Sequence, residues 1–306
     1  MARRYLSVDD LSPKELETLF ELSARLKSHP GEYADRLRGC SVALVFEKPS
    51  TRTRVSFEVG VAQLGGHTVV LSSSELQLGR GETIEDTGRV LSRYVDAIVL
   101  RTFEQERIEV LAGAATVPVV NGLSDFEHPC QALADLFTVR EHLGGPTGHT
   151  LAYLGDGNNV AHSLLLAGAK AGMRVRVATP PGFEPIPQVA NRAAEIAGET
   201  GGAVEVLHDP EEAAADADVL YTDAWASMGQ EEEAAERALV FPSYQINQKL
   251  VDLAAPGVIV LHCLPAHRGQ EITDEVIDGP RSAVWDQAEN RLHTQKALLL
   301  FLFDPA

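Results

Sequence analysis

Short apolar segments alternate with longer segments of helical spacing along most of the chain. In the first half, the apolar segments cover residues 42–46, 67–71, 97–100 and 117–120. Between them, apolar residues recur every three or four positions, as they do from Ile84 to Tyr94. Short apolar runs predict buried strands, and the longer period predicts amphipathic helices. This alternation predicts a parallel sheet with helices on both faces.

A glycine-rich stretch at residues 144–148 divides this pattern into two halves. A helix is predicted before it, at about residues 129–143, and a second series of strands follows it. These strands are predicted at residues 151–154, 174–178, 204–207, 219–221 and 258–261. The fold class is therefore α/β, with two doubly wound parallel-sheet domains of similar size, residues 1–145 and 146–286. Ligands of such sheets bind at the carboxyl ends of strands, so we expect an active-site cleft between the domains.

Composition narrows the possible partners. The 306 residues suffice for two ordinary domains, and 26 basic against 44 acidic residues give a net charge of −18. Such a charge argues against nucleic acid or an acidic membrane as a partner, and no apolar run reaches the length of a membrane span. The chain has three cysteines without a Cys-x-x-Cys pair and no N-terminal signal segment. These features predict a cytoplasmic protein without a disulfide framework.

The densest polar cluster follows the first predicted strand of the sheet. Ser50, Thr51, Arg52 and Thr53 lie between that strand and a helical pattern that begins at Val55. A helix N-terminus presents unpaired N–H groups and the positive end of the helix dipole, which favour an anion. Hydroxyl and guanidinium donors at this point suit a phosphate group. The alternative is an ordinary serine cap with surface arginines, but the density of donors favours an anion site.

Other polar residues stand where predicted strands end or helices begin. Arg101 follows a strand, and His128 and Gln131 open the helix before the domain boundary. In the second half, Asp223 and Cys263 each follow a strand closely. Since ligands bind at this edge of a parallel sheet, all five residues are candidates for one site.

Two motifs raise the question of a cofactor or a metal. The stretch at residues 155–160 resembles a dinucleotide-binding turn, but it lacks the third glycine, and no acidic residue ends the next strand. His262, Cys263 and His267 contain metal-ligating side chains, but no second Cys/His cluster completes a tetrahedral set. We therefore expect neither a nicotinamide cofactor nor a metal.

Taken together, these motifs resemble those of the aspartate and ornithine carbamoyltransferase family. The stretch from Ser50 to Thr53 is similar to the carbamoyl-phosphate signature of the family, and the likeness extends in order from Leu44 to Ala297. The Asp-x-x-x-Ser-Met-Gly motif at residues 223–229 and the His-Cys-Leu-Pro motif at residues 262–265 resemble the ornithine-specific branch. Ala224 stands where a bulkier apolar residue is common.

The resemblance implies a role for each candidate residue. For carbamoyl phosphate, the implied binding residues are Ser50, Thr51, Arg52, Thr53, Gln77, Arg101, His128, Gln131, Cys263, Leu264 and Arg291. For L-ornithine, they are Asn159, Asp223, Ser227 and Met228. The implied catalytic residues are Arg101, His128, Asp223 and Cys263.

The implied reaction transfers the carbamoyl group of carbamoyl phosphate to the side-chain amine of L-ornithine. It gives L-citrulline and phosphate, needs no cofactor, and belongs to arginine metabolism. The resemblance also implies that a C-terminal helix (about residues 287–306) joins the first domain, and that a homotrimer shares its active sites through the loop of Gln77. The alternatives are transfer to another amine such as putrescine or an acylated ornithine, a catalytically silent carbamoyl-phosphate-binding subunit, and a nicotinamide dehydrogenase.

Overall fold

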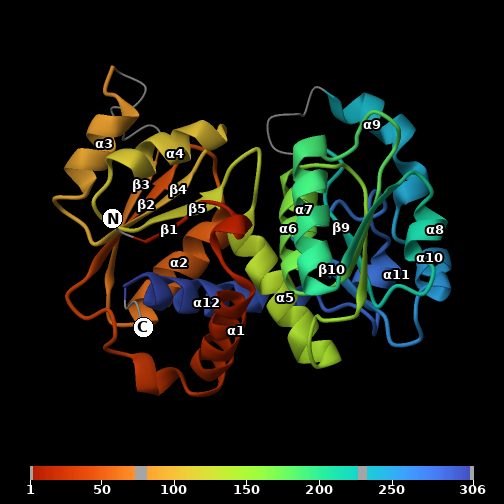
Figure 1. Ribbon diagram of the computed structural model, residues 1–306, viewed down its shortest axis with the longest axis horizontal. Helices are drawn as coiled ribbons and strands as arrows, with labels where there is room; N and C mark the ends of the chain where they lie inside the picture. The colour runs from red at the N-terminus through yellow and green to blue at the C-terminus, as the bar shows by residue number, and fades with distance from the viewer. Residues whose placement is uncertain (1–2, 73–80, 227–232, 304–306) are drawn as a thin grey trace. The chain divides into compact units, whose positions relative to one another are not determined.

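The computed structural model describes residues 3–72, 81–226 and 233–303 (Figure 1). The chain forms two compact units, which we call the first unit (Met1–Ala134 with Glu289–Ala306) and the second unit (Asp135–Ala288). The chain leaves the first unit within α5 (Pro129–Leu143) and returns to it within α12 (Val284–Phe303). Each unit is an α/β structure around one parallel five-stranded sheet, so the predicted fold class is confirmed.

The sheet of the first unit follows the doubly wound pattern. Its strands, in spatial order, are β1 (Arg4–Tyr5), β5 (Val119–Leu123), β4 (Ala97–Arg101), β2 (Ser41–Phe46) and β3 (His67–Ser72). The chain passes from β2 outward to β3 and then crosses to β4 on the opposite side of β2. The carboxyl ends of β2 and β4 therefore flank a topological switch point, where open α/β sheets bind ligands.

Helices cover both faces of this sheet, as predicted. The unit contains α1 (Pro13–Ser28), α2 (Thr51–Gln63), α3 (Ile84–Leu91) and α4 (Gln105–Ala114), with the short 3-10 helices η1 (Val8–Asp10) and η2 (Pro30–Tyr33). Figure 1 shows α3 and α4 on one side of the strands and α2 with α12 on the other. On the first side, Ala43 and Val45 of β2 pack with Ile108 and Leu111 of α4. On the second side, a Cβ atom at Gly60 would lie 3.2 Å from the side chain of Lys296, so a glycine permits the close approach of α2 and α12.

The second unit repeats the same plan. Its strands, in spatial order, are β10 (Ile259–His262), β9 (Val219–Thr222), β6 (Thr150–Leu154), β7 (Arg174–Ala178) and β8 (Ala203–Leu207). Its helices are α6 (Asn159–Lys170), α7 (Pro187–Thr200), α8 (Pro210–Ala214), α9 (Ala234–Val240), α10 (Gln248–Leu253) and α11 (Asp274–Ile277), with η5 (Pro242–Tyr244). Ala152 and Leu220 share a buried cluster with Ala213 of α8 and Val276 of α11. The switch point of this sheet lies between β6 and β9.

All nine strands expected from the apolar segments are present, and their ends differ from the predicted ends by no more than three residues. The two-residue β1 strand was not predicted, because it is too short to give a period. Among the described residues, no helix combines the length and the apolar character that crossing a membrane requires.

Candidate functional site

The N-terminus of α2 lies directly after β2, at the switch point of the first sheet. Ser50 is the N-cap residue, and its Oγ accepts a hydrogen bond of 3.2 Å from the N–H of Thr53. The side chains of Thr51 and Arg52 are exposed in the first turn, while Thr53 is buried. The helix begins at Thr51, earlier than the predicted helical pattern at Val55, and it has hydroxyl and guanidinium donors at the positive end of its dipole.

Arg291 of α12 connects this helix start to α5. Its Nη1 donates to Oε1 of Gln131 at 2.6 Å, and its Nη2 donates to Oγ1 of Thr53 at 2.9 Å. All three side chains are buried. Both acceptors are neutral, so these two hydrogen bonds orient the guanidinium without cancelling its charge.

His128 and Arg101 complete the first group of predicted residues. Arg101 is the last residue of β4, whereas the prediction placed it directly after the strand. His128 immediately precedes α5. Burial lowers the pKa of His128 well below its usual value, and Arg291, Arg101 and Arg52 lower it further, in that order. The imidazole is therefore neutral at neutral pH, with one N–H donor in a locally positive environment. This group is a local exception to the acidic character of the chain.

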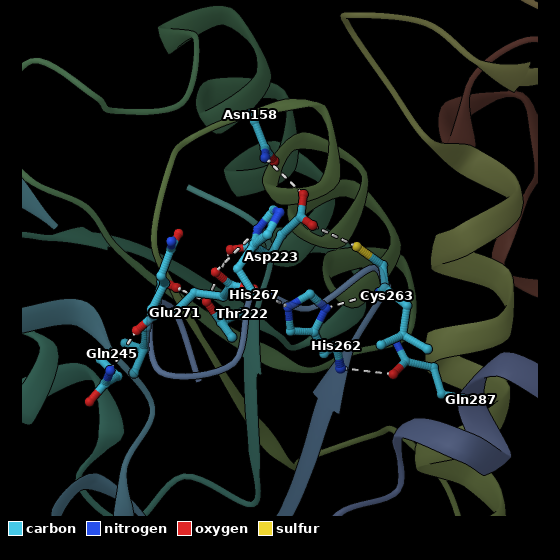
Figure 2. Close-up of polar contacts among 12 residues, drawn as sticks. Asn158, Thr222, Asp223, Gln245, His262, Cys263, His267, Glu271 and Gln287 are labelled. Atoms are coloured by element: carbon cyan, nitrogen blue, oxygen red, sulfur yellow. Dashed lines mark hydrogen bonds and ion pairs between the residues drawn. The ribbon is translucent and has the colours of Figure 1, made fainter. Parts of the chain in front are cut away.

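A second group of predicted residues lies at the switch point of the second sheet (Figure 2). Asp223 directly follows β9, and Cys263 directly follows β10. Sγ of Cys263 donates to Oδ1 of Asp223 at 2.9 Å, and Nδ2 of Asn158 donates to Oδ2 of the same carboxylate at 3.0 Å. The neighbouring strand ends thus bring together a carboxylate, a thiol and an amide, as the topology predicts.

Asn158 was missed in the sequence, although a signal for it was present. It is the N-cap residue of α6, and its Oδ1 accepts hydrogen bonds from the N–H groups of Val160 and Ala161 at 2.9 and 3.2 Å. These bonds fix the amide, so that its NH₂ group faces Asp223. Asn159, which the family resemblance singles out, is the adjacent first residue of α6 and is half-buried.

A buried network holds the turn that carries Cys263. The N–H of Leu264 donates to Nδ1 of His262 at 2.9 Å, so Nε2 is the protonated nitrogen and donates to Oε1 of Glu271 at 3.1 Å. The side chains of His262 and Glu271 are fully buried. Gln287 accepts the N–H of His262 at 2.8 Å, as Figure 2 shows. Glu271 has no neighbouring motif in the sequence, so its part in the site was not predictable from a pattern.

Three residues of the second group have metal-ligating atoms close enough together to bind one ion. Ligand atoms of Asp223, His262 and Cys263 lie within 4.8 Å of one another. However, both nitrogens of His262 already have hydrogen-bond partners, Leu264 and Glu271. Coordination of a metal by this histidine would have to break one of these bonds. The arrangement is better suited to an amine, which a carboxylate and a thiol can both contact.

Arg237 of α9 supports the turn between β6 and α6. Its guanidinium lies 2.9 Å from the carboxylate of Asp156, donates to the carbonyl oxygen of Trp225 at 2.7 Å, and lies 5.0 Å from the ring centroid of Phe183. Burial raises the pKa of Asp156, and Arg237 opposes this effect. The pair fixes the turn two residues before Asn158.

The structure thus places most of the predicted residues in two groups, one in each unit. Gln77, Ser227 and Met228 lie outside the described residues. Leu264 lies in the Cys263 turn with a φ angle of 58°, in the left-handed region.

Comparisons with known proteins agree with this division. The family profile for the carbamoyl-P binding domain of aspartate/ornithine carbamoyltransferases matches residues 3–141, and the profile for the Asp/Orn binding domain matches residues 147–302. An ornithine carbamoyltransferase of Parafrankia sp. is 63% identical over 306 residues, 99% of this chain and 96% of the relative. One from Acidothermus cellulolyticus is 63% identical over 308 residues, 100% of this chain and 98% of the relative.

A solved structure extends the likeness from sequence to fold. The ornithine carbamoyltransferase from Pyrococcus furiosus superimposes with a TM-score of 0.94 at 56% identity, covering 97% of this chain and 96% of that chain. The two domain profiles together cover nearly the whole length of the sequence, and each relative does so alone. The chain therefore belongs to the aspartate/ornithine carbamoyltransferase family.

Proposed function

We propose that this chain is an ornithine carbamoyltransferase, which converts carbamoyl phosphate and L-ornithine to L-citrulline and phosphate. The observation that carries the proposal is the 2.9 Å contact between Cys263 and Asp223, with Asn158 on the other carboxylate oxygen. This group can bind a cationic or neutral amine at the edge of the second sheet. The names of the similar proteins support the same reaction.

We propose that the first unit is the carbamoyl-phosphate-binding domain. The N–H groups and hydroxyls at the start of α2 bind the phosphate together with Arg52, in the manner of other helix N-termini. Arg101, His128 and Thr53 polarise the carbonyl oxygen, and Gln131 contacts the amide of the carbamoyl group. The proposed binding residues for carbamoyl phosphate also include Arg291, together with Leu264 and Cys263 of the second unit. The support for these roles is the positive environment around the neutral His128.

The second unit is the ornithine-binding domain in this proposal. Asp223, Asn159, Ser227 and Met228 bind the amino acid, and Cys263 orients its side-chain amine. The neutral amine nitrogen attacks the carbonyl carbon, and the donors around His128 stabilise the oxyanion that forms. The C–O bond to phosphate then breaks, and the departing phosphate accepts the proton that the amine loses. The reaction balances without a cofactor.

An assay of the carbamoylated product, which is citrulline when the acceptor is ornithine, tests this function. Purified enzyme with carbamoyl phosphate is offered L-ornithine, N-acetyl-L-ornithine, putrescine or L-aspartate at equal concentrations. We expect carbamoylation of ornithine to exceed that of each other amine by at least about 10²-fold, because a site built for charged groups rejects analogues that leave them unpaired. Preferential use of another amine would reassign the substrate. No product with any amine would favour a silent binding subunit.

We also propose that the chain assembles as a homotrimer whose sites are shared through Gln77. The proposal rests on the family resemblance of this position, and heterologous contacts of this kind close into a ring. Gln77→Ala and Cys263→Ala, each expected to be nearly inactive, are unfolded and refolded together in equal amounts. If the two residues act in different subunits, about one quarter of all the sites in the refolded mixture are intact. Mixed trimers without recovered activity would show that each subunit keeps its own site.

A cytoplasmic location is also part of the proposal. Cys40, Cys130 and Cys263 are all described, and none forms a disulfide. Reduced cysteines are typical of cytoplasmic proteins. Fractionation of cells that produce the protein, followed by immunoblotting, tests this location.

A further inference from the structure

The N-terminal segment Tyr5–Val8 contacts the residues on either side of His128. Oη of Tyr5 donates to the carbonyl oxygen of Pro129 at 3.1 Å. The carboxylate of Glu127 accepts from Oγ of Ser7 at 2.5 Å and from the N–H of Val8 at 3.0 Å. Two separate connections from one segment therefore bracket a histidine that lies more than a hundred residues later in the sequence.

The hydrogen bonds from Tyr5 and from the N–H of Val8 are buried, and the one from Ser7 is partly buried. Tyr5 is 0% exposed, and Val8 and Glu127 are each 1% exposed. A buried carboxylate is costly unless hydrogen bonds satisfy it, so loss of the partners of Glu127 should displace its backbone. Hydrogen bonds without competing water also hold their geometry well.

Further hydrogen bonds hold Glu127 within its own loop and hold the N-terminal segment against the sheet. The N–H of Ser124 donates to the carbonyl oxygen of Glu127 at 2.9 Å, and Oγ of Ser124 accepts the N–H of Glu127 at 3.1 Å. Nδ2 of Asn121 donates to the carbonyl oxygen of Leu6 at 2.9 Å, and β1 pairs with β5 through Tyr5 and Val120. The N-terminal segment is thus anchored to the sheet itself.

We propose that Glu127 and Tyr5 are positioning residues that fix His128 at the catalytic site by tethering residues 127 and 129 to the N-terminal segment. This inference rests on the proposed function of His128 in polarising the carbonyl group. A displacement of about 1 Å at a reacting group can cost about 10²-fold in rate. The direction in which the chain enters α5 sets the position of His128, and the hydrogen bonds at Glu127 and Pro129 fix this direction before and after the histidine.

Three substitutions test the tethers. Glu127→Leu removes both acceptors at similar volume and should lower kcat by about 30-fold, since a misplaced donor stabilises the oxyanion less. Glu127→Gln should stay within about threefold of wild type, because its amide accepts from Val8 and donates to Ser7. Tyr5→Phe removes one hydroxyl and should lower kcat by about fivefold, which keeps the idea testable if Glu127→Leu does not fold.

Glu15→Leu is the matched control. Glu15 also accepts a serine hydroxyl and a backbone N–H, both from Ser12, at 2.8 and 2.9 Å, but these bonds are exposed and form the capping box of α1. Its kcat should equal that of wild type. If Glu15→Leu lowers kcat as much as Glu127→Leu, the effect is one of general stability, and the proposal is overturned.

A double-mutant cycle with His128→Ala separates positioning from stability. If Glu127 acts through His128, Glu127→Leu should have no further effect on kcat in the His128→Ala background. The same 30-fold loss in both backgrounds, or a loss below twofold in the wild-type background, would overturn the inference. If wild type forms no citrulline, the proposed function fails, and the cycle is instead measured on the Kd of carbamoyl phosphate by calorimetry.

Discussion

The two groups of site residues occupy equivalent places in two similar sheets, but their charges are opposite. In the first unit, Arg291 donates to Gln131 and Thr53, which are neutral acceptors. In the second unit, Asp223 accepts from Asn158 and Cys263, which are neutral donors. These hydrogen bonds fix the direction of each charged group without cancelling its charge. In the proposed function, the same architecture binds an anion in one unit and an amine in the other.

The two groups differ in how they are built. The first depends on a helix N-terminus and on a cluster of arginines around His128, whose pKa they lower. The second depends on strand ends, with the Cys263 turn held by the buried pair of His262 and Glu271. The first group is centred on a helix N-terminus that is visible as one motif in the sequence, whereas the second is assembled from residues at three strand ends and a supporting network. The following predictions test this contrast.

The largest expected effect is that of Asp223→Asn on the amine side. A charged partner that is buried and hydrogen-bonded is worth about 2–5 kcal/mol, so kcat/KM for ornithine should fall by about 10³-fold. Steady-state citrulline assays measure it. Asp252→Asn is the control: this exposed carboxylate accepts a hydrogen bond from Nε2 of Gln248 at 2.7 Å, and kcat/KM of the variant should stay within about twofold of wild type. Wild-type kinetics in Asp223→Asn would remove the aspartate from the amine site.

The next effect is that of Arg52→Lys on the anion side. Lysine keeps the charge but lacks the planar fork of donors, so the affinity for carbamoyl phosphate should fall by about 10²-fold. Calorimetric titration gives the Kd. Arg89→Lys serves as the control, since Arg89 is exposed and pairs with Asp86. An unchanged Kd in Arg52→Lys would contradict the anion site at this helix start.

A smaller effect concerns the pH dependence of the rate. The ornithine amine must lose its proton, and its pKa is close to that of lysine, about 10.4. At subsaturating ornithine, the rate should therefore rise from pH 7 to 9, by up to about tenfold per pH unit. His128 adds no rising limb in this range, because its lowered pKa keeps it neutral throughout. A flat profile would argue against the neutral amine as the nucleophile.

The smallest effect concerns the stability of the first unit. The pKa of His128 is lower in the folded state than in the unfolded state, so the unfolded state binds more protons below about pH 6.5. Stability should be complete above that pH and should fall as the pH decreases towards the folded-state pKa. His128→Gln cannot titrate and should reduce the fall in Tm between pH 7.5 and 5.5 by a few degrees. Equal falls in wild type and variant would contradict a buried neutral histidine.

More of the fold and of the anion group than of the amine group could be predicted from the sequence. Period and glycine placement predicted the parallel strands, since a buried parallel strand is a continuous apolar run. The start of α2 was predictable because caps and dipole effects are local. Glu271 and Glu127 were not, because their partners are set by tertiary packing; Glu127 and Ser7 are 120 residues apart. The role of Asn158 as a helix cap could have been predicted, but its hydrogen bond to Asp223 depends on the order of the strands in the sheet.

Titration of carbamoyl phosphate into Asp223→Asn tests the division of charge between the units most directly. The account predicts the Kd of wild type within about twofold, because the anion group lies in the first unit and keeps its arginines, while Arg52→Lys binds about 10²-fold more weakly under the same conditions. A loss of carbamoyl-phosphate affinity in Asp223→Asn as large as that in Arg52→Lys would contradict it.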